Sequence, residues 1–408
     1  MNYNEGWYNK GMKTKFINRH IGTTVKKYAD IFPAVALLGA RQVGKTTLLK
    51  NLFKKGYNYI CLDDLEQRDY ADADPKGFLE DAGNRAIIDE IQYVPKLFSY
   101  VKMKIDKDPS VMGRYIFTGS QNFLLMKEFT ETLAGRIGVV NIHPLSCFEI
   151  PLKTEKPSEL FEKAALRGGY PVLWKNKKLP VEPWYKSYVK VYIERDVRNL
   201  FNIGSLRSFH VFVRILASRA GQLLNLTSLA VDSGVSVNTI KSWISVLESS
   251  GLIYLLHPYH KNIRSKLVKS PKVYFLDTGI ISFFNGIDSP ARMVKSGQKG
   301  ILFENFVISE IIKKSDNSGA EIELSFFRNH SGLEVDIIIE NEGRRTAAEI
   351  KSGIGAGRDS AGKMLRMEKE HPAMKMDKKY VVTFGQGSIP VARNVKCVSF
   401  IEFLNKVI

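Results

Sequence analysis

The stretch AVALLGARQVGKTTLL, residues 34–49, decides the fold of the first part of this chain. It fills every fixed position of the phosphate-binding pattern G-x-x-x-x-G-K-[ST]. The apolar run before the loop predicts a buried strand, and apolar residues at helical spacing follow it. Glycines let successive backbone N–H groups face a phosphate, and the N-terminus of the helix adds a partial positive charge. The stretch therefore predicts a nucleoside triphosphate site.

Each position of this loop has an expected task. The ammonium of Lys45 should reach the β- and γ-phosphates, and the hydroxyl of Thr46 should ligate Mg²⁺. The alternative is a glycine-containing turn without a ligand, which is disfavoured because strand, loop and helix follow in the required order. The predicted nucleotide-binding residues are Gly39, Ala40, Arg41, Gln42, Val43, Gly44, Lys45, Thr46 and Thr47.

A second motif, AIIDE at residues 86–90, is an apolar strand that ends in two carboxylates. We expect Asp89 to hold the Mg²⁺ shell and Glu90 to polarise the attacking water. Alone, an apolar strand that ends in Asp-Glu is uninformative. Downstream of a phosphate-binding loop, it indicates a Walker B strand.

Further strands are predicted at residues 57–62, 114–118 and 137–142, with helical segments between them. An amphipathic helix, residues 13–30, precedes the first strand. Strands that alternate with helices indicate an α/β fold with a parallel sheet covered on both faces. The phosphate then lies at the carboxyl ends of the strands.

Two polar positions near these strand ends are candidates for sensing the γ-phosphate. Ser120 is the first choice and Asn122 the reserve, although a helix N-cap explains either residue almost as well. Arg136 is a candidate finger or sensor, because a fixed guanidinium suits the charge of a phosphoryl transition state. An ordinary surface or ion-paired arginine is an equally good explanation.

The composition is that of a soluble globular protein, with 408 residues of which 44% are hydrophobic and 25% charged. No apolar run approaches the length of a membrane span, and the polar start does not resemble a signal peptide. The three cysteines, Cys61, Cys147 and Cys397, are isolated, which argues against disulfides or a cysteine metal site. We therefore expect a cytoplasmic protein with no membrane partner.

The formal net charge of +18 is unevenly spread along the chain. Residues 1–160 hold 23 basic and 19 acidic side chains, whereas residues 161–408 hold 37 and 23. A basic second part points to nucleic acid as a candidate partner, although a solvated basic face explains much of the same pattern.

The middle of the chain begins after a linker-like segment, residues 151–157, and includes a long charged helix predicted at 181–201. Arg195 on that helix is a second candidate for contact with nucleotide, but an intrahelical ion pair explains it more simply. Residues 208–258 then read as helix, helix, helix and strand, with Thr227 or Ser228 capping the second helix. This order is that of a winged helix.

The third of these helices leaves a polar face of the kind that a recognition helix offers to the DNA major groove. Lys241 lies on that face. The segment after the strand is basic and is expected to contact phosphates as a wing. Its basic residues are Lys261, Arg264, Lys266, Lys269 and Lys272. The alternative is a winged helix that serves only to pack or to bind protein.

The last part of the chain contains a predicted hairpin, with strands at residues 334–340 and 346–351 and a two-residue loop, Glu342-Gly343. If this loop sets the register, residue i faces residue 685 − i. Asp336 then faces Glu349, and such a pair holds a divalent cation or protonates one carboxyl. The apolar alternation predicts that only one face of the hairpin is buried. The rival explanation is an ion pair between Glu334 and Lys351 in solvent.

Across nearly its whole length, the chain resembles the prokaryotic AAA-type ATPases whose C-terminal domain of unknown function resembles the PD-(D/E)xK nucleases. The motifs that carry the resemblance are GARQVGKTTLL, IIDEIQ, FTGSQNFLL, ETLAGRI, HPLSCFEI, RGGYP, ERDV, YFLDTG, FENFVISEI and EVDIIIE…AEIK. The resemblance implies ATP and Mg²⁺ as cofactors. It also implies four segments: a P-loop AAA-type ATPase domain (1–150), a helical lid or linker (151–205), a winged-helix domain (206–285) and a restriction-endonuclease-like α/β domain (286–408).

In the resemblance, Asp336, Glu349 and Lys351 match the D…E-x-K core, and Glu304 matches the acidic helix position. Glu304, Asp336 and Glu349 would then form a second metal site. The motif's proline is absent, since Val335 precedes Asp336. The expected function is a Mg²⁺-dependent ATPase that couples nucleotide state to DNA binding, with DNA cleavage left open. The alternative is a nucleotide-switched DNA- or protein-binding module with an inactive nuclease-like domain.

Overall fold

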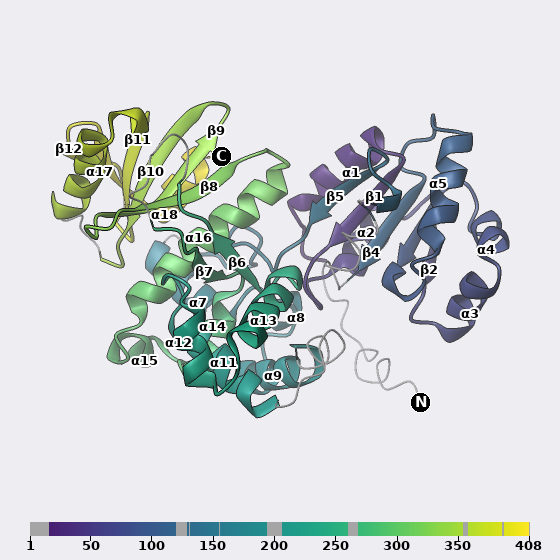
Figure 1. Ribbon diagram of the computed structural model, residues 1–408, viewed down its shortest axis with the longest axis horizontal. Coiled ribbons are helices and arrows are strands. Elements are labelled where there is room, and N and C mark those ends of the chain that lie inside the picture. Colours follow the sequence, from purple (N-terminus) through teal and green to yellow (C-terminus); the bar gives the residue numbers. More distant parts are fainter. Residues whose placement is uncertain are drawn as a thin grey trace.

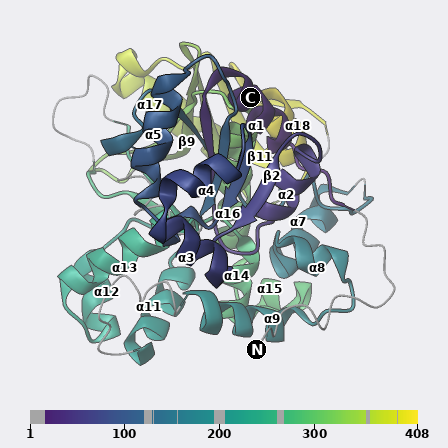
Figure 2. The same ribbon diagram turned by 90° about the vertical axis from the view of Figure 1, so that its right-hand side faces the viewer.

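The computed structural model describes residues 16–119, 129, 131–154, 156–193, 206–259, 268–353, 358–385 and 387–407. Figure 1 shows a sheet at each side of the molecule and a group of helices below and between them. The view turned by 90° in Figure 2 shows the same helical group below the sheets. The chain therefore builds three modules, which are described in turn.

The first module is a five-stranded sheet in the order β2-β3-β4-β1-β5, and every neighbouring pair is parallel. All five residues of the central strand β1 are buried, as expected for a strand covered on both faces. The prediction of a parallel α/β sheet is confirmed. The strands are β1 (Ala34–Leu38), β2 (Asn58–Cys61), β3 (Ala86–Asp89), β4 (Tyr115–Gly119) and β5 (Ile137–Asn141).

Helices cover both faces of this sheet. Val35 and Leu37 pack into the same core as α1 (Ile21–Ile31) and α2 (Lys45–Leu52). The alternate β1 residues pack against the helices on the other face, which are α3 (Leu65–Ala73), α4 (Pro75–Asp81) and α5 (Leu97–Lys107), while η1 (Ile91–Tyr93) follows β3. The first helix begins at Ile21, later than the predicted start at residue 13, and residues 1–15 lie outside the described ranges.

The second module is helical. Its elements are α7 (Pro157–Arg167), α8 (Pro171–Lys175), α9 (Val181–Tyr188), η2 (Val189–Ile193), α11 (Leu206–Ser218), α12 (Leu226–Ser233), α13 (Val237–Ser249), α14 (Thr278–Phe284) and α15 (Pro290–Lys295), with strands β6 (Ile253–Leu256) and β7 (Lys272–Phe275). The order helix, helix, helix, strand after residue 206 is as predicted. The long helix expected at 181–201 ends its α-helical part at Tyr188 and continues as the π-helical η2. Arg195 lies outside the described residues.

Local signals explain where α12 and α13 begin and end. The side chain of Asn225, rather than Thr227 or Ser228, caps α12 by accepting from the backbone N–H of Ser228 at 3.0 Å. Gly234 ends α12 with φ 66°, a left-handed conformation that favours glycine. Ser236 then caps α13. Because α13 starts there, Lys241 is exposed on its outer face.

The third module is a six-stranded mixed sheet in the order β12-β13-β11-β10-β9-β8. Glu342 and Gly343 form its two-residue turn with φ of 49° and 76°, and the pairing of Arg344 with Asn341 confirms the predicted register. The elements are β8 (Glu323–Arg328), β9 (Glu334–Asn341), β10 (Arg344–Ile350), β11 (Lys378–Thr383), β12 (Ile389–Ala392), β13 (Val395–Ser399), α16 (Lys299–Ser318), α17 (Arg358–Glu370), η3 (Pro372–Met374) and α18 (Phe400–Val407).

Contrary to the prediction, both faces of the β9–β10 hairpin are buried. Ile337 and Ala348 pack into the core that includes α16 and α18, whereas Ile338 and Ala347 pack against Met364 and other residues of α17. Ile338 and Ala347 share the face of Asp336 and Glu349, so the strands themselves carried a sign of this second cover, although α17 is polar on average. The carboxylates of the hairpin therefore lie in the protein interior.

One hydrophobic core joins the three modules. The ring of Phe161 on α7 lies 5.2 Å from Phe303 on α16 and 5.2 Å from Phe384 after β11, measured between ring centroids. The same cluster continues to Val35 in the first sheet. Among the helices of the described ranges, none has the length and apolar character needed to cross a membrane.

Candidate functional site

The loop between β1 and α2 requires glycine at two places. A Cβ on Gly39 would lie 2.1 Å from the carbonyl oxygen of Ile142, so only glycine allows the loop to approach the end of β5 this closely. Gly44 has φ 97° and leads directly into α2. The side chain of Lys45 is buried under the loop, where its ammonium donates to the carbonyl oxygens of Gly39 (2.8 Å) and Ala40 (3.0 Å).

The predicted Walker residues meet at the carboxyl ends of the strands. The hydroxyl of Thr46 donates to Oδ2 of Asp89 at 2.7 Å, and the phenol of Tyr59 donates to the same oxygen at 2.6 Å. Thr118, fully buried at the end of β4, donates to Oδ1 of Asp89. A hydroxyl beside a carboxylate is a set of oxygen donors that suits Mg²⁺. Thr46 and Asp89 therefore fit the predicted ion.

The sequence analysis did not identify Tyr59 and Thr118. Burial and the hydrogen bond to Asp89 raise the pKa of Tyr59, so its phenol remains a donor. Thr118 could have been found from strand alignment, because it stands near the end of β4, which neighbours β3. Tyr59 could not, because it lies near the start of β2 and reaches Asp89 only through its long side chain. The predicted sensors Ser120 and Asn122 lie outside the described residues.

Glu90 follows Asp89 in a left-handed backbone conformation with φ 56°, which is uncommon for a residue other than glycine. Its N–H donates to Oγ1 of Thr118 at 3.3 Å, and its carboxylate accepts from the amide of Gln92. This turn directs Glu90 away from the path of β3. Strained residues of this kind often serve function.

Arg136 does not join this group. It immediately precedes β5, so it lies at the amino ends of the parallel strands, the edge opposite to the phosphate loop. Its guanidinium makes an ion pair with Asp106 at 2.5 Å. The structure thus corrects the expectation that Arg136 contacts the nucleotide of its own chain, and favours the ion-paired surface arginine.

A buried arginine that the sequence analysis missed supports the loop instead. Nη1 of Arg19 donates to the carbonyl oxygen of Val43 at 2.7 Å, and Nη2 donates to that of His143 at 2.6 Å. Burial lowers the pKa of Arg19, and the nearby Glu149, at 3.3 Å, opposes this shift. Arg19 therefore ties the phosphate loop to the segment that follows β5.

The other two modules also reach the phosphate loop. The phenol of Tyr188 on α9 donates to the carbonyl oxygen of Arg41 at 3.3 Å. A Cβ on Gly251, between α13 and β6, would lie 3.4 Å from the backbone nitrogen of Ala40. A cavity of about 280 Å³ beside Gly39 is lined by residues of all three modules, including Tyr254 and Asp316. The phosphate loop thus lies next to residues of every module, and a movement of the loop would reach all three.

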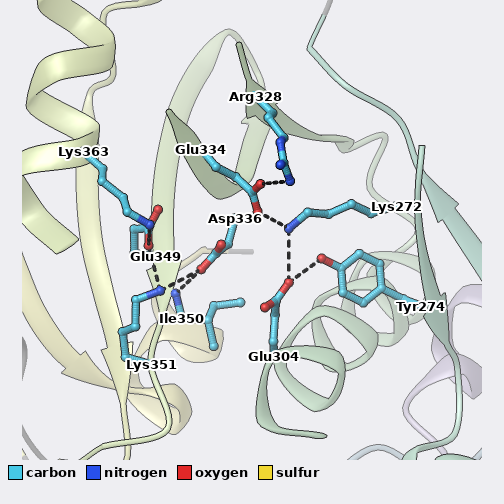
Figure 3. Close-up of polar contacts among 10 residues, drawn as sticks. All are labelled: Lys272, Tyr274, Glu304, Arg328, Glu334, Asp336, Glu349, Ile350, Lys351 and Lys363. Carbon is cyan, nitrogen blue, oxygen red and sulfur yellow. Dashed lines mark hydrogen bonds and ion pairs between the residues drawn. The ribbon is translucent and has the colours of Figure 1, made fainter. Parts of the chain in front are cut away.

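A second group of charged side chains lies between the helical module and the second sheet (Figure 3). Asp336 and Glu349 come from facing strands, as predicted, and Oδ2 of Asp336 accepts from the backbone N–H of Ile350 at 2.7 Å. Nζ of Lys351 lies 2.9 Å from Oε2 of Glu349 and 3.7 Å from Oδ2 of Asp336. Lys351 thus stands beside both carboxylates, as the resemblance implied.

Glu304 reaches the same group from α16, but its partners are cations and hydroxyls of β7. Its Oε1 accepts from the phenol of Tyr274 at 2.7 Å and lies 3.3 Å from Nζ of Lys272. Burial, and then the charge of Asp336, raise the pKa of Glu304. Lys272 was expected to contact DNA phosphates from an exposed wing, and the structure shows that this is wrong, because its side chain is only 3% exposed.

The rival ion pair between Glu334 and Lys351 is not formed. Glu334 instead pairs with Lys272 at 2.6 Å and with Arg328 at 2.8 Å. In the part of the chain that the structure describes, no three His, Cys, Asp or Glu side chains converge into a group that could hold a metal ion. One oxygen does fit a cation, since Oε1 of Glu349 is buried without a hydrogen-bond partner. Two of the three predicted ligands, Asp336 and Glu349, thus lie together at Lys351, whereas the third, Glu304, pairs with Lys272.

The predicted DNA-binding residues have different surroundings. Lys241 on α13 and Lys269 before β7 are exposed. Lys261, Arg264 and Lys266 lie outside the described residues. The exposed lysines are therefore available to a phosphate backbone, in contrast to Lys272.

Comparison with protein families gives one match of known character. Residues 32–151 match the family model of an AAA domain, which supports the prediction of a P-loop AAA-type ATPase domain that binds nucleotide. Residues 158–291 and 299–403 match two domains of unknown function, DUF8612 and DUF4143. Neither match tests the predicted winged helix or the predicted nuclease-like character.

Two curated relatives are uncharacterized proteins, Mb2031c of Mycobacterium bovis and Rv2008c of Mycobacterium tuberculosis. Each is 28% identical over 322 residues, which is 78% of this chain and 70% of the relative. Among solved structures, the Walker-type ATPase PABY2304 of Pyrococcus abyssi has a TM-score of 0.45 at 16% identity and covers 68% of this chain and 98% of its own. The RuvB Holliday junction branch migration motor of Thermotoga maritima has a TM-score of 0.28 at 17% identity, with coverage of 57% and 88%.

Proposed function

We propose that this protein is a Mg²⁺-dependent ATPase whose nucleotide state is coupled to DNA binding. The observation that carries the proposal is the contact between Thr46 of the phosphate loop and Asp89 of the Walker B strand, with Glu90 as the next residue. When bound, Mg²⁺ neutralises phosphate charge.

The residues of the chain then have separate tasks. The ammonium of Lys45 exchanges its loop carbonyls for phosphate oxygens, to which it donates charged hydrogen bonds. Thr46 and Asp89 would hold the ion. Glu90 would orient the attacking water and accept its proton, because it directly follows Asp89 at the carboxyl end of β3.

DNA binding is proposed for the face of the helical module that carries Lys241 and Lys269. Both side chains are exposed, and the part of the chain after residue 160 carries most of the net positive charge. Contacts to phosphate release counterions and give affinity with little sequence preference. The three helices and the β6–β7 pair would then act as a winged helix.

The helix α16 supports coupling between the modules. Near its C-terminal end, the carbonyl oxygen of Asn317 accepts from the hydroxyl of Thr24 at 2.6 Å, and Asp316 contacts His143 at 2.5 Å. Near its N-terminal end it carries Glu304. A helix is stiff, so a shift of the ATPase module would reach the charged group between β7 and β9.

For that charged group we propose a single divalent cation held by Asp336 and Glu349, with Lys351 positioned to steady the charge of a phosphate. The orphaned Oε1 of Glu349 favours this assignment. The second candidate function is a nucleotide-switched DNA- or protein-binding module without cleavage. The ion pairs of Glu304 and Glu334 with Lys272 favour that candidate, because they leave fewer carboxylates for a metal.

One set of measurements on the full chain separates these functions. ATP hydrolysis is measured with Mg²⁺, with and without duplex DNA, and the same preparation is assayed for DNA cleavage with Mn²⁺. We expect hydrolysis whose rate changes when DNA is added. Hydrolysis without cleavage would support the second candidate for the last module, and absence of nucleotide hydrolysis under all conditions would refute the ATPase.

A further inference from the structure

Lys272 is a buried cation of the helical module that reaches a group of four carboxylates in the third module. These carboxylates belong to Glu304, Glu334, Asp336 and Glu349. Lys272 lies at the start of β7 in the helical module, whereas Glu304 and Glu334 belong to α16 and β9. Its Nζ lies 2.6 Å from Oε1 of Glu334 and 3.3 Å from Oε1 of Glu304 (Figure 3). Two residues further along β7, Tyr274 donates to Glu304 as well. Strand β7 therefore occupies one half of the group.

Lys272 differs from the other cations around these carboxylates in its exposure. One of them, Lys363, lies with its Nζ 3.4 Å from Oε2 of Glu349. The side chains of Arg328, Lys351 and Lys363 are 38%, 40% and 42% exposed, whereas that of Lys272 is 3% exposed. Water screens the first three and lets their side chains move. Lys272 has no such freedom, and its charge acts in a medium of low dielectric constant.

The ammonium of Lys272 contacts two carboxylates at once, those of Glu334 and Glu304. Glu334 also pairs with Arg328 at 2.8 Å. Lys272 and Glu334 therefore form an ion pair in the interior.

We propose that Lys272 is a built-in cation that fills the Glu304–Glu334 half of the group and thereby confines divalent metal to the Asp336–Glu349 half. The inference rests on the metal site of the proposed function. A lysine ammonium at 2.6 Å satisfies a carboxylate oxygen that an ion would otherwise take. In the other half, Oε1 of Glu349 is left without a donor. The group thus takes one divalent ion, and Lys272 replaces a second.

The test counts bound Mn²⁺ on the full chain, from the loss of the free-ion signal in electron paramagnetic resonance. Wild type is compared with Lys272→Met, which keeps the aliphatic stem but removes the charge. We expect Lys272→Met to bind one ion more than wild type, because Glu304 and Glu334 become available. Any ion at the ATPase site contributes equally to both proteins and cancels in the difference.

Two further variants control for indirect effects. Arg328→Met removes the exposed partner of the same Glu334 and should leave the count unchanged. Lys272→Met combined with Glu334→Gln should lose the extra ion, because a ligand has been removed together with the lysine. Equal counts in wild type and folded Lys272→Met would overturn the proposal, and so would an extra ion in Arg328→Met.

The proposal stays testable if Lys272→Met does not fold, as judged by circular dichroism. Glu334→Gln alone should then leave the Mn²⁺ count of the wild type unchanged, because Lys272 rather than a metal holds that carboxylate. A loss of one ion in Glu334→Gln would overturn the proposal. Failure of the metal site itself is distinguishable, since Asp336→Asn would then leave the Mn²⁺ count of the wild type unchanged, while Lys272→Met still bound one ion more than wild type.

Discussion

The hydroxyl of Thr46 lies 2.7 Å from Oδ2 of Asp89, although 43 residues separate them in the chain. The parallel sheet produces this contact, because β1 and β3 end at the same edge, where Asp89 is the last residue of β3 and the loop after β1 leads to Thr46 at the start of α2. The phosphate loop and the Walker B strand, which are two separate motifs in the sequence, thus form one site.

Lys45→Ala should weaken the binding of a fluorescent ATP analogue by about 10- to 100-fold, since a hydrogen bond from a charged group contributes roughly 1.5–3 kcal/mol. The control is Lys54→Ala, an exposed lysine that lies just after the same helix α2. That variant should bind as wild type does. Equal affinity of all three proteins would remove Lys45 from the site.

Glu90→Gln should retain ATP but lose about 10²- to 10⁴-fold in hydrolysis rate, because the amide keeps the shape of the side chain and cannot accept a proton. Phosphate release and retention of labelled ATP are measured on the same sample. Glu66→Gln, an exposed glutamate in the first turn of α3, serves as the control. Full turnover by Glu90→Gln would show that another group activates the water.

Reversing the charge of Lys241 and Lys269 to Glu should weaken binding to unrelated duplexes alike. The slope of log affinity against log salt should become shallower by about one for each DNA phosphate that the variant no longer neutralises. Fluorescence anisotropy at several salt concentrations measures both effects, with Lys107→Glu on the exposed side of α5 as the control. If the wild type binds no duplex even at low salt, the helical module serves packing alone.

Stability should depend on pH through Glu349. Burial, and then the charge of Asp336, raise the pKa of this carboxyl from 4.5 to about 7, against the opposing effect of Lys351. The folded state therefore holds the proton more tightly than the unfolded chain. The resulting stabilisation is full below pH 4.5 and is lost as the pH rises through about 7.

Urea unfolding in the presence of a chelator checks this sign. Between pH 5.5 and 8, wild type should lose about 2 kcal/mol more than Glu349→Gln, whose amide resembles the protonated carboxyl. Glu342→Gln, at the exposed hairpin turn, should behave as wild type. A wild type and a Glu349→Gln variant with parallel pH profiles would contradict the shifted pKa.

Asp336→Asn should abolish any Mn²⁺-dependent DNA cleavage, because the amide keeps an acceptor for the backbone N–H of Ile350 but is a poor metal ligand. Asp377→Asn is the matched control, since Asp377 likewise accepts from a backbone N–H of β10, that of Arg345, at 2.8 Å. Cleavage that persists in Asp336→Asn would leave the last module as a binding domain.

Features that depend on residues close together in the chain could be predicted from the sequence. The turn at Glu342-Gly343 sets the hairpin register through its two left-handed residues, and this register brings Asp336 and Glu349 together. The position of Arg136 was also implicit in the sequence, because a residue just before a parallel strand lies at the edge away from the phosphate. A stricter use of that rule would have excluded contact between Arg136 and the nucleotide of its own chain.

Other features depend on partners that no local pattern shows. Lys272 stands in a basic segment and was expected to be exposed, yet its carboxylate partner Glu304 lies 32 residues away on another module. The second cover of the β9–β10 hairpin comes from α17, whose polar composition hid its buried side. Such long-range pairs are fixed by packing, which the order of residues along the chain does not display.

The contacts of the Phe161 ring affect both the folding of the newly synthesised chain and its unfolding. It belongs to a helix that precedes β6 and β7 in the chain, yet it packs against Phe303, Phe306 and Phe384 at centroid distances of 5.2–5.4 Å. A growing chain thus holds this ring without its complete set of neighbours until residue 384 has been synthesised. The three modules, which match three different family models, should therefore unfold in a single cooperative transition. Two fragments divided near residue 298 should aggregate when each is produced alone and be soluble when they are produced together.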